Sequence, residues 1–407
     1  MLYNWKPNRG GILNFTDSLA NIQKKQNKVF IMYFHSEEVL EEDIYEQEDI
    51  TYIHPFQVLD PMRKNAPVTH YSDRQVQQQI LTYVVKVNPD VVHVQTCYGI
   101  SSSIIPLLEK QGYKTIVHMH DYLCVCPKQN LYLFDKENCY HPGRMCKECL
   151  TSTASSQDFE RRYKHNIENY NKASKIIMNS TFIEKKFIKW GIIKDKSTVI
   201  LNGLDTRLCD PSTVKNRFTK DYLNKKLVFV HFSSCAPMKG VIQLVKVFNI
   251  IANEIDKEKL ANLELRIYGA KSRIYKTLNS LATHKMSVKI YPPYKSEEIS
   301  KIIEDADVTV LPHLWWDPLP FTVIESLFYG VPVIGSKDSG MNELIQDGIN
   351  GYLIDPHNID EFKNKIINII HNPKIIDSMK KNVKELYLRT MNETAAEINN
   401  VYKELNV

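Results

Sequence analysis

Short runs of apolar and β-branched residues alternate with longer amphipathic stretches along most of the chain. Each run is almost continuously hydrophobic, which is typical of parallel strands covered by helices on both faces. The pattern predicts strands at 29–34, 90–94, 114–120, 175–179 and 198–202, and then at 226–232, 263–269, 288–292, 307–312 and 332–336. We therefore expect an α/β protein made of two doubly wound, Rossmann-like domains.

The best candidate for a domain boundary is Asn202-Gly203-Leu204-Asp205, because Asn-Gly favours a turn and regular alternation restarts only at Leu227. We predict a first domain over 1–204 and a second over 205–385. The pattern predicts a last helix over about 375–405 that could pack on either domain. We assign 386–407 as a C-terminal helix that packs back on the first domain. Two such domains would face one another across a cleft at the carboxyl ends of their strands, where ligands usually bind.

Composition and charge narrow the class of protein. The chain has 407 residues, of which 43% are hydrophobic and 24% charged, so a long disordered or coiled-coil protein is excluded. A net charge of +5 over this length is too weak to indicate nucleic-acid binding. The first twenty residues lack the apolar core of a signal peptide, and no run approaches the roughly 20 apolar residues of a membrane span. We expect a cytoplasmic protein, at most peripheral to the inner face of the cell membrane.

The basic amphipathic stretch 182–190 is the candidate for membrane contact. It directly follows a predicted strand, so a helix that faces the core with a solvated lysine side is the favoured interpretation.

The most informative stretch runs from Leu311 to Asp355. A loop with Asp317 follows a strand, and a helix near 321–329 carries Glu325. The free N–H groups of Phe321, Thr322 and Val323 open this helix and offer a site for a phosphate. Two carboxylates that accept hydrogen bonds from ribose and sugar hydroxyls would complete a nucleotide-sugar site.

This segment resembles the donor-binding signature of GT-B glycosyltransferases, in particular the retaining group called glycosyltransferase family 4. The signature has two acids separated by seven residues, then Gly-x-Pro-Val-Ile, a turn, a further Glu and Asn-Gly. The matching positions are Asp317, Glu325, Gly330 to Ile334, Ser339-Gly340, Glu343 and Asn350-Gly351, together with Gly10-Gly11, His120-Asp121, Asn202 to Asp205 and Lys239-Gly240 elsewhere in the chain. Their joint occurrence in this order is specific, whereas one piece alone would be weak.

The resemblance implies a glycosyltransferase that moves a sugar, with retention, from a nucleotide-sugar donor to a glycan, lipid-linked or other surface-polysaccharide acceptor. It implies that catalysis needs no metal ion or other cofactor. Glu325 would hold the ribose, and Asp317 would face the transferred sugar. Lys239, with Gly10 and Gly11, would stabilise the diphosphate, and His120 would lie near the donor sugar. The residues alone leave His120 equally open to a packed role at the end of its strand.

Two departures from the signature keep alternatives open. Asp317 is one methylene shorter than the usual Glu, and Ser234 replaces the arginine that usually lies five positions before Lys239. Lys271 or Arg273 would then have to supply the missing charge. A non-catalytic GT-B subunit that supports an active partner, or a nucleotide-sugar epimerase on the same fold, is the alternative function. The oligomeric state is left open.

Five of the eight cysteines fall between Cys124 and Cys149. In a reducing compartment such a cluster indicates metal binding or plain buried thiols. A terminal Cys-x-x-Cys with two further thiols is compatible with a structural zinc site. Part of the family resembles this chain in its cysteine spacing, which implies the set Cys126, Cys139, Cys146 and Cys149. Unliganded thiols, or disulfides in an exported protein, are the alternatives. We expect the acceptor to dock on the first domain, between the glycine loop and this insertion at 124–149.

Overall fold

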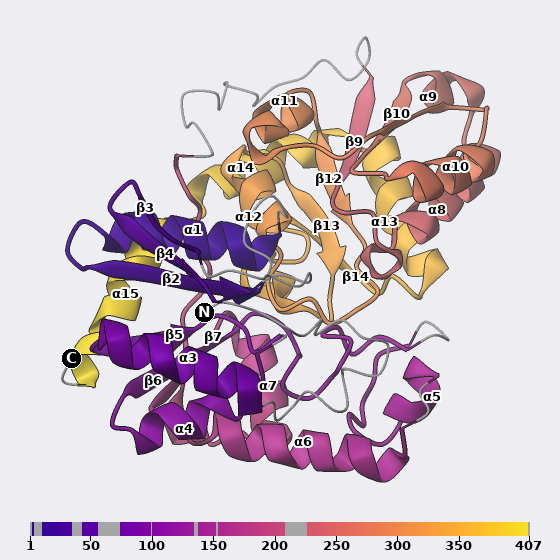
Figure 1. Ribbon diagram of the computed structural model, residues 1–407. Helices are drawn as coiled ribbons and strands as arrows, with labels where there is room; N and C mark the ends of the chain where they lie inside the picture. Colours follow the sequence, from indigo (N-terminus) through magenta and orange to yellow (C-terminus); the bar gives the residue numbers. More distant parts are fainter. Residues whose placement is uncertain are drawn as a thin grey trace. The chain divides into compact units, whose positions relative to one another are not determined.

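The chain divides into two compact units in the computed structural model, which describes residues 2–3, 10–34, 43–55, 74–98, 100–133, 137–151, 154–207 and 226–405 (Figure 1). The first unit comprises Met1–Asn202 together with Met391–Val407, and the second comprises Gly203–Thr390. The passage from the first unit to the second lies inside the predicted boundary segment, Asn202 to Asp205. The C-terminal return occurs at Met391, five residues beyond the predicted limit of 385/386.

The second unit is built on a parallel sheet with the strand order β11-β10-β9-β12-β13-β14. This is the doubly wound order 3-2-1-4-5-6, in which the direction of winding reverses between the first and fourth strands. The strands are β9 (Leu227–Phe232), β10 (Leu263–Tyr268), β11 (Ser287–Tyr291), β12 (Val308–Leu311), β13 (Val333–Ser336) and β14 (Gly351–Ile354). The first five were predicted. The short edge strand β14 was not.

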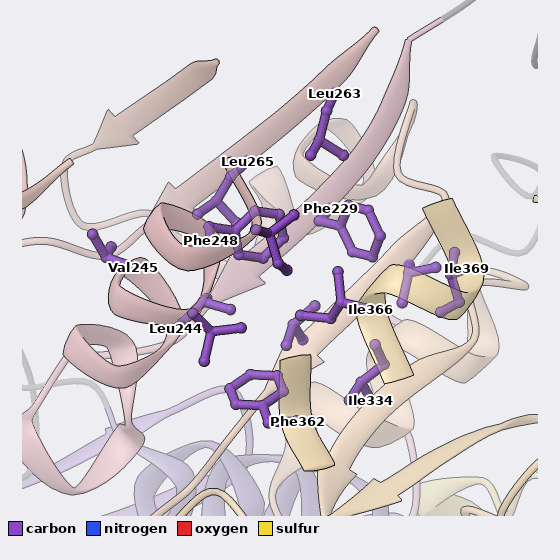
Figure 2. Close-up of a cluster of buried hydrophobic side chains, with 14 of the residues drawn as sticks. Phe229, Leu244, Val245, Phe248, Leu263, Leu265, Ile334, Phe362, Ile366 and Ile369 are labelled. Carbon is purple, nitrogen blue, oxygen red and sulfur yellow. The ribbon is translucent and has the colours of Figure 1, made fainter. Parts of the chain in front are cut away.

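The core of the second unit lies between the sheet and two helices, α8 (Val241–Glu254) and α13 (Ile359–His371). Figure 2 shows Phe229 of β9, Phe248 of α8 and Phe362 of α13 among the buried side chains of this cluster. The rings of Phe229 and Phe248 meet edge to face, with centroids 5.4 Å apart. Burial of each such ring contributes roughly 1.5–3 kcal/mol to the hydrophobic stabilisation of the unit.

The remaining helices of the second unit are short or lie at its ends. They are the 3-10 helices η3 (Pro237–Lys239), η4 (Ser296–Glu298) and η5 (Gly340–Glu343), and the α-helices α9 (Lys257–Ala261), α10 (Ser272–Leu281), α11 (Ile299–Ile303), α12 (Phe321–Phe328) and α14 (Lys374–Glu385). Predicted helix 321–329 therefore corresponds to α12 within one residue.

The first unit contains two four-stranded sheets among its described residues, in the orders β1-β2-β4-β3 and β5-β6-β7-β8. Their strands are β1 (Leu2–Tyr3), β2 (Val29–Phe34), β3 (Asp43–Gln47), β4 (Ile50–His54), β5 (Val91–Val94), β6 (Lys114–Met119), β7 (Lys175–Met178) and β8 (Ser197–Val199). The described helices are α1 (Gly11–Gln23), α3 (Arg74–Val87), α4 (Ile104–Lys110), α5 (Cys146–Leu150), α6 (Ser156–Tyr170), α7 (Thr181–Lys189), the 3-10 helix η1 (Lys194–Lys196) and, from the C-terminal end, α15 (Met391–Glu404). The five strands predicted for this half are present.

One part of the first unit departs from the predicted parallel pattern. β3 and β4 form an antiparallel hairpin, and neither strand was predicted. Glu48 and Asp49 connect them with φ values of 50° and 60°. Positive φ at both turn residues gives the twist that suits a two-residue hairpin, although the sequence lacks the glycine or asparagine that usually marks one.

The C-terminal helix prediction needs a correction, because the stretch 375–405 is two helices. α14 ends at Glu385, and α15 (Met391–Glu404) packs against α1 in the first unit. Between them the backbone N–H of Leu204 donates to the carbonyl oxygen of Arg389 at 2.9 Å. This pairing takes the chain out of helical geometry just before it returns to the first unit.

The amphipathic stretch 182–190 forms a helix that faces the core, which was the favoured interpretation. Ile183 and Phe187 of α7 are fully buried, whereas Lys185 and Lys189 are exposed. None of the helices within the described ranges is long and apolar enough to cross a membrane.

Candidate donor and acceptor sites

The switch point of the second sheet brings together two predicted site residues that lie 78 positions apart. β9 and β12 are neighbours, Lys239 follows β9, and Asp317 follows β12. The Nζ atom of Lys239 lies 2.8 Å from Oδ2 of Asp317. Asp317 is 4% exposed, so its carboxylate forms a buried ion pair. Ligands of doubly wound sheets usually bind at this point.

His313, which the sequence analysis did not single out, is a second partner of Asp317. Nδ1 of His313, which is buried, lies 2.9 Å from the same Oδ2 atom of Asp317. Burial acts to raise the pKa of Asp317, but Lys239 and His313 outweigh it and lower the pKa to about 2. Burial and then the charge of Lys239 lower the pKa of His313 to about 4. A histidine four residues before the acid, just past a buried strand, was the available signal.

Lys239 is held by a backbone conformation that requires the glycine after it. Gly240 has a φ of 70°, and a Cβ atom there would lie 1.8 Å from the carbonyl oxygen of Pro312. This close approach connects the loop after β9 with the loop after β12. The ammonium of Lys239 also lies 5.3 Å from the ring centroid of Trp315, within cation–π range. Gly240 opens α8 without any side-chain cap.

Glu325 and the predicted phosphate-binding amides lie on α12. Phe321 and Thr322 are its first two residues, and no side chain caps its N-terminus. Burial raises the pKa of Glu325 to about 7. The charge of Glu325 adds to burial in raising the pKa of Tyr294, so the two side chains are close. Within the described residues, the buried Oγ1 atom of Thr322 has no hydrogen-bond partner.

The structure places the proposed substitutes for the missing arginine beyond the end of β10, which neighbours β9. Ser234 is exposed, as are Lys271, which precedes α10, and Arg273 in its first turn. Gly269, at the end of β10, packs against the carbonyl oxygen of Ser233. Lys271 and Arg273 therefore lie beyond the same, carboxyl-terminal, edge of the sheet as Lys239.

The predicted residues of the first unit lie around α1 and β6. Gly10 precedes α1 and Gly11 opens it, again without a side-chain cap. A Cβ atom at Gly10 would meet no described atom within 4 Å. Nε2 of His120 lies 2.8 Å from Oε1 of Gln95, and its ring stacks on His118 with a centroid distance of 4.1 Å. Burial lowers the pKa of His120 to about 3, so its imidazole is neutral at physiological pH.

The four predicted zinc ligands do converge, since Cys126, Cys139, Cys146 and Cys149 all line one small cavity. They are free cysteines, and burial raises the pKa of Cys139 to about 11 and of Cys146 to about 12. A zinc site would need the sulfur atoms about 2.3 Å from one point. Over the described ranges, no three His, Cys, Asp or Glu side chains are arranged to hold a metal ion. The structure therefore does not support the predicted zinc.

Family profiles match most of the chain. The profile of Glycosyltransferase Family 4 matches residues 9–208, and that of Glycosyl transferases group 1 matches residues 214–386. The chain belongs to the GT-B glycosyltransferases. Two solved GT-B relatives show the same fold over nearly the whole chain. A sucrose-phosphate synthase from Thermosynechococcus elongatus has a TM-score of 0.71 at 16% identity, covering 99% of this chain and 98% of that one. HepE from Anabaena, in complex with UDP, has a TM-score of 0.68 at 16% identity, covering 99% of each chain.

Curated relatives of this GT-B protein match over shorter stretches. A UDP-Gal:α-D-GlcNAc-diphosphoundecaprenol α-1,3-galactosyltransferase from Escherichia coli is 32% identical over 95 residues, which is 23% of this chain. The match covers 24% of that enzyme's length, 14% of a sucrose synthase from Thermosynechococcus vestitus and 46% of an uncharacterised glycosyltransferase from Haemophilus influenzae. The fold prediction of two Rossmann-like domains is confirmed. Membership of a cysteine-rich subgroup stays a prediction.

Proposed function

We propose that this protein transfers a sugar, with retention, from a nucleotide-sugar donor to a glycan, lipid-linked or other surface-polysaccharide acceptor. We place the reaction in the cytoplasm, at or near the inner face of the cell membrane. The observation that carries the proposal is the Lys239–Asp317 pair at the switch point of the second sheet, with its 2.8 Å contact. A lysine ammonium held in place at a ligand-binding edge is what a diphosphate leaving group needs.

Cleavage of the bond between sugar and phosphate builds negative charge on the diphosphate. Lys239 and the uncapped N-terminus of α12 carry positive charge in this unit, and such preorganised groups stabilise a developing anion. Asp317 neutralises Lys239 when the site is free. We infer that an entering diphosphate shares the lysine with Asp317, so that the ammonium is held in place before the donor arrives.

Glu325 supports the recognition of a nucleoside. Its pKa of about 7 means that the carboxyl group is about half ionised at neutral pH. Donation by two ribose hydroxyls would favour the ionised form, because a carboxylate accepts hydrogen bonds more strongly than a neutral acid. UDP is bound by HepE, and the name of the Escherichia coli relative gives UDP-Gal as its donor. Uridine nucleotide sugars are therefore the first donors to test.

In the first unit, Gly10, Gly11 and His120 are the residues that the family signature assigns to the donor. Gly10 precedes α1, and a Cβ atom there would meet no described atom within 4 Å, which would allow a ligand to approach the backbone closely. The neutral imidazole of His120 would orient sugar hydroxyls rather than supply a charge. The four clustered cysteines carry no step of this proposal.

The test is incubation of the purified protein with a panel of uridine, guanosine and adenosine nucleotide sugars and a lipid-linked or glycan acceptor. Free nucleoside diphosphate and a glycosylated acceptor are expected, whereas a changed sugar on an intact nucleotide would indicate an epimerase. Lys239→Gln should lower the rate of transfer more than it lowers nucleotide affinity, because the charge on the diphosphate grows in the transition state. A wild-type rate in Lys239→Gln would contradict the proposal.

A non-catalytic subunit is the second candidate, and Ser234 is the observation that favours it. Its hydroxyl is exposed at the end of β9 and carries no charge, so one cation of the family pattern is missing. This candidate predicts nucleotide-sugar binding without transfer until a partner is added. If the missing charge is the cause, Ser234→Arg should raise the rate at which nucleotide is released from the donor. If the protein is instead active because Lys271 replaces the arginine, Lys271→Gln should abolish sugar transfer.

A further inference from the structure

The first unit contains a second pocket for which the proposed donor chemistry gives no role. Its volume is about 330 Å³, and it lies between the cysteine-rich loop, α6 and the end of α7. The lining side chains that matter here are Tyr140, Arg144, Glu160, Tyr163, Lys164 and Trp190. All belong to one compact unit. Ligand pockets usually range from about 300 to 1,000 Å³, so this one suits a single sugar with a substituent.

The segments that form the walls of this pocket contact one another directly, through packing and a hydrogen bond. Gly143 brings the loop against α6, where a Cβ atom would lie 3.2 Å from Cβ of Tyr163. The hydroxyl of Tyr163 donates to the carbonyl oxygen of Trp190 at 2.8 Å. Trp190 in turn packs edge to face on Phe187, which is fully buried. The pocket is therefore largely preformed, and a ligand would not have to order it.

The charges on the walls select an anion. Arg144 and Lys164 are exposed cations, and neither forms an ion pair with any residue that the structure describes. Glu160 is the single carboxylate and is likewise unpaired within those ranges. Glu160 and Lys164 lie one turn apart on α6, at a spacing that allows contact, yet their charged atoms are not within 4.0 Å. Two cations against one carboxylate leave an excess positive charge for a ligand.

The aromatic rings select a saccharide. Tyr140 is 63% exposed, and a ring with so much of its surface in water gains from covering it. Tyr163 and Trp190 are partly exposed at the same pocket. The C–H faces of a pyranose stack on such rings, while its hydroxyls reach the polar rim. The guanidinium of Arg144 and the ammonium of Lys164 then match the oxygen atoms of a phosphate ester.

We propose that this pocket binds a phosphorylated sugar unit of the acceptor, and so holds the acceptor on the first unit. The role as an acceptor site rests on the proposed transferase function, whereas the binding itself does not. A phosphate group has several charged oxygen atoms that accept hydrogen bonds from both cations at once, which a single carboxylate does less well. The phosphate group can belong to a phosphate-linked polymer or to the diphosphate of a lipid carrier.

The binding experiment uses the full-length protein, glucose 1-phosphate as the probe, and tryptophan fluorescence as the readout. Saturable quenching is expected, and Trp190→Phe should remove it, which assigns the signal to this pocket. Arg144→Gln and Lys164→Gln should each weaken binding about tenfold. Lys185→Gln is the matched control, because Lys185 is an exposed lysine on α7 outside the pocket. Equal binding by wild type and both pocket variants would overturn the proposal.

Two further ligands separate the parts of the recognition. Methyl α-glucoside lacks the phosphate, and inorganic phosphate lacks the sugar, so both should bind at least about tenfold more weakly than the probe. If inorganic phosphate binds as tightly as glucose 1-phosphate, the pocket is only an anion patch and the saccharide assignment is wrong. If methyl α-glucoside binds as tightly, the phosphate assignment is wrong.

Transfer assays distinguish this proposal from the transferase function. With a phosphate-linked glycerol polymer or a diphosphate-linked lipid acceptor, Lys164→Gln should raise the KM for the acceptor about tenfold and leave acceptor-independent release of nucleotide unchanged. The acceptor that shows the change identifies the source of the phosphate. An unchanged KM for both acceptors would overturn the acceptor role. If no donor releases nucleotide, the transferase function fails while the binding result stands.

Discussion

Removing the charge of Asp317 tests the buried ion pair at the candidate donor site. In Asp317→Asn the side chain keeps its shape but can no longer neutralise Lys239, whose Nζ atom lies 2.8 Å away. The pKa of Asp317 falls from 3.8 to about 2 in the folded protein. At roughly 1.4 kcal/mol per pKa unit, this difference contributes on the order of 2–3 kcal/mol to the free energy of unfolding at pH 7. For a unit of this size the loss lowers the Tm by about 5–10 °C.

The difference in Tm between wild type and Asp317→Asn should depend on pH in a defined direction. A depressed folded-state pKa stabilises the protein above the unfolded pKa of 3.8, and the stabilisation is lost as the pH falls through about 2. The Tm of wild type should therefore exceed that of Asp317→Asn by a constant amount from pH 5 to 8, and the gap should close toward pH 2. Differential scanning calorimetry measures both.

The exposed residue Asp338 provides the control for the calorimetry, because it forms no ion pair with a described residue. Asp338→Asn should leave the Tm within about 1 °C of wild type. Equal Tm values for wild type and Asp317→Asn at pH 7 would refute the reasoning, since the pair would then contribute no net stabilisation.

Three further predictions concern other parts of the two units. Glu325→Gln should weaken UDP binding about tenfold at pH 8 and much less at pH 6, because the wild-type carboxyl has a pKa of about 7 and ionises as the pH rises; isothermal titration calorimetry at both pH values checks this. Gly240→Ala should destabilise the second unit by about 2–4 kcal/mol, since its Cβ atom would clash with the carbonyl oxygen of Pro312; urea unfolding measures the loss. Tyr402→Phe removes a hydroxyl that lies 2.8 Å from Nδ1 of His93 and should cost about 1 kcal/mol. An unchanged unfolding midpoint would show that this hydroxyl contributes no net stability to the docking of α15.

Much of the fold could be predicted because its signals are local. Continuous apolar runs gave the strands from β5 to β13, and Asn202-Gly203 marked the passage between the units. The hairpin β3–β4 was missed because its turn residues Glu48 and Asp49 adopt left-handed conformations without the glycine that usually marks a two-residue hairpin turn. The stretch 375–405 was read as one helix because the pairing of Leu204 with Arg389, which interrupts it, joins segments 185 positions apart.

The sequence by itself determined the residue types at the candidate donor site and the helix or loop on which each lies. The spacing of Asp317 and Glu325 predicted a loop acid and a helix acid, and α12 starts at the predicted Phe321. Only the tertiary structure decided that Asp317 is buried against Lys239 and His313. It also decided that the four cysteines line a cavity without the arrangement of a metal site. Periodicity encodes which face of an element is apolar, whereas partners from distant segments depend on strand order and side-chain packing, which no local pattern records.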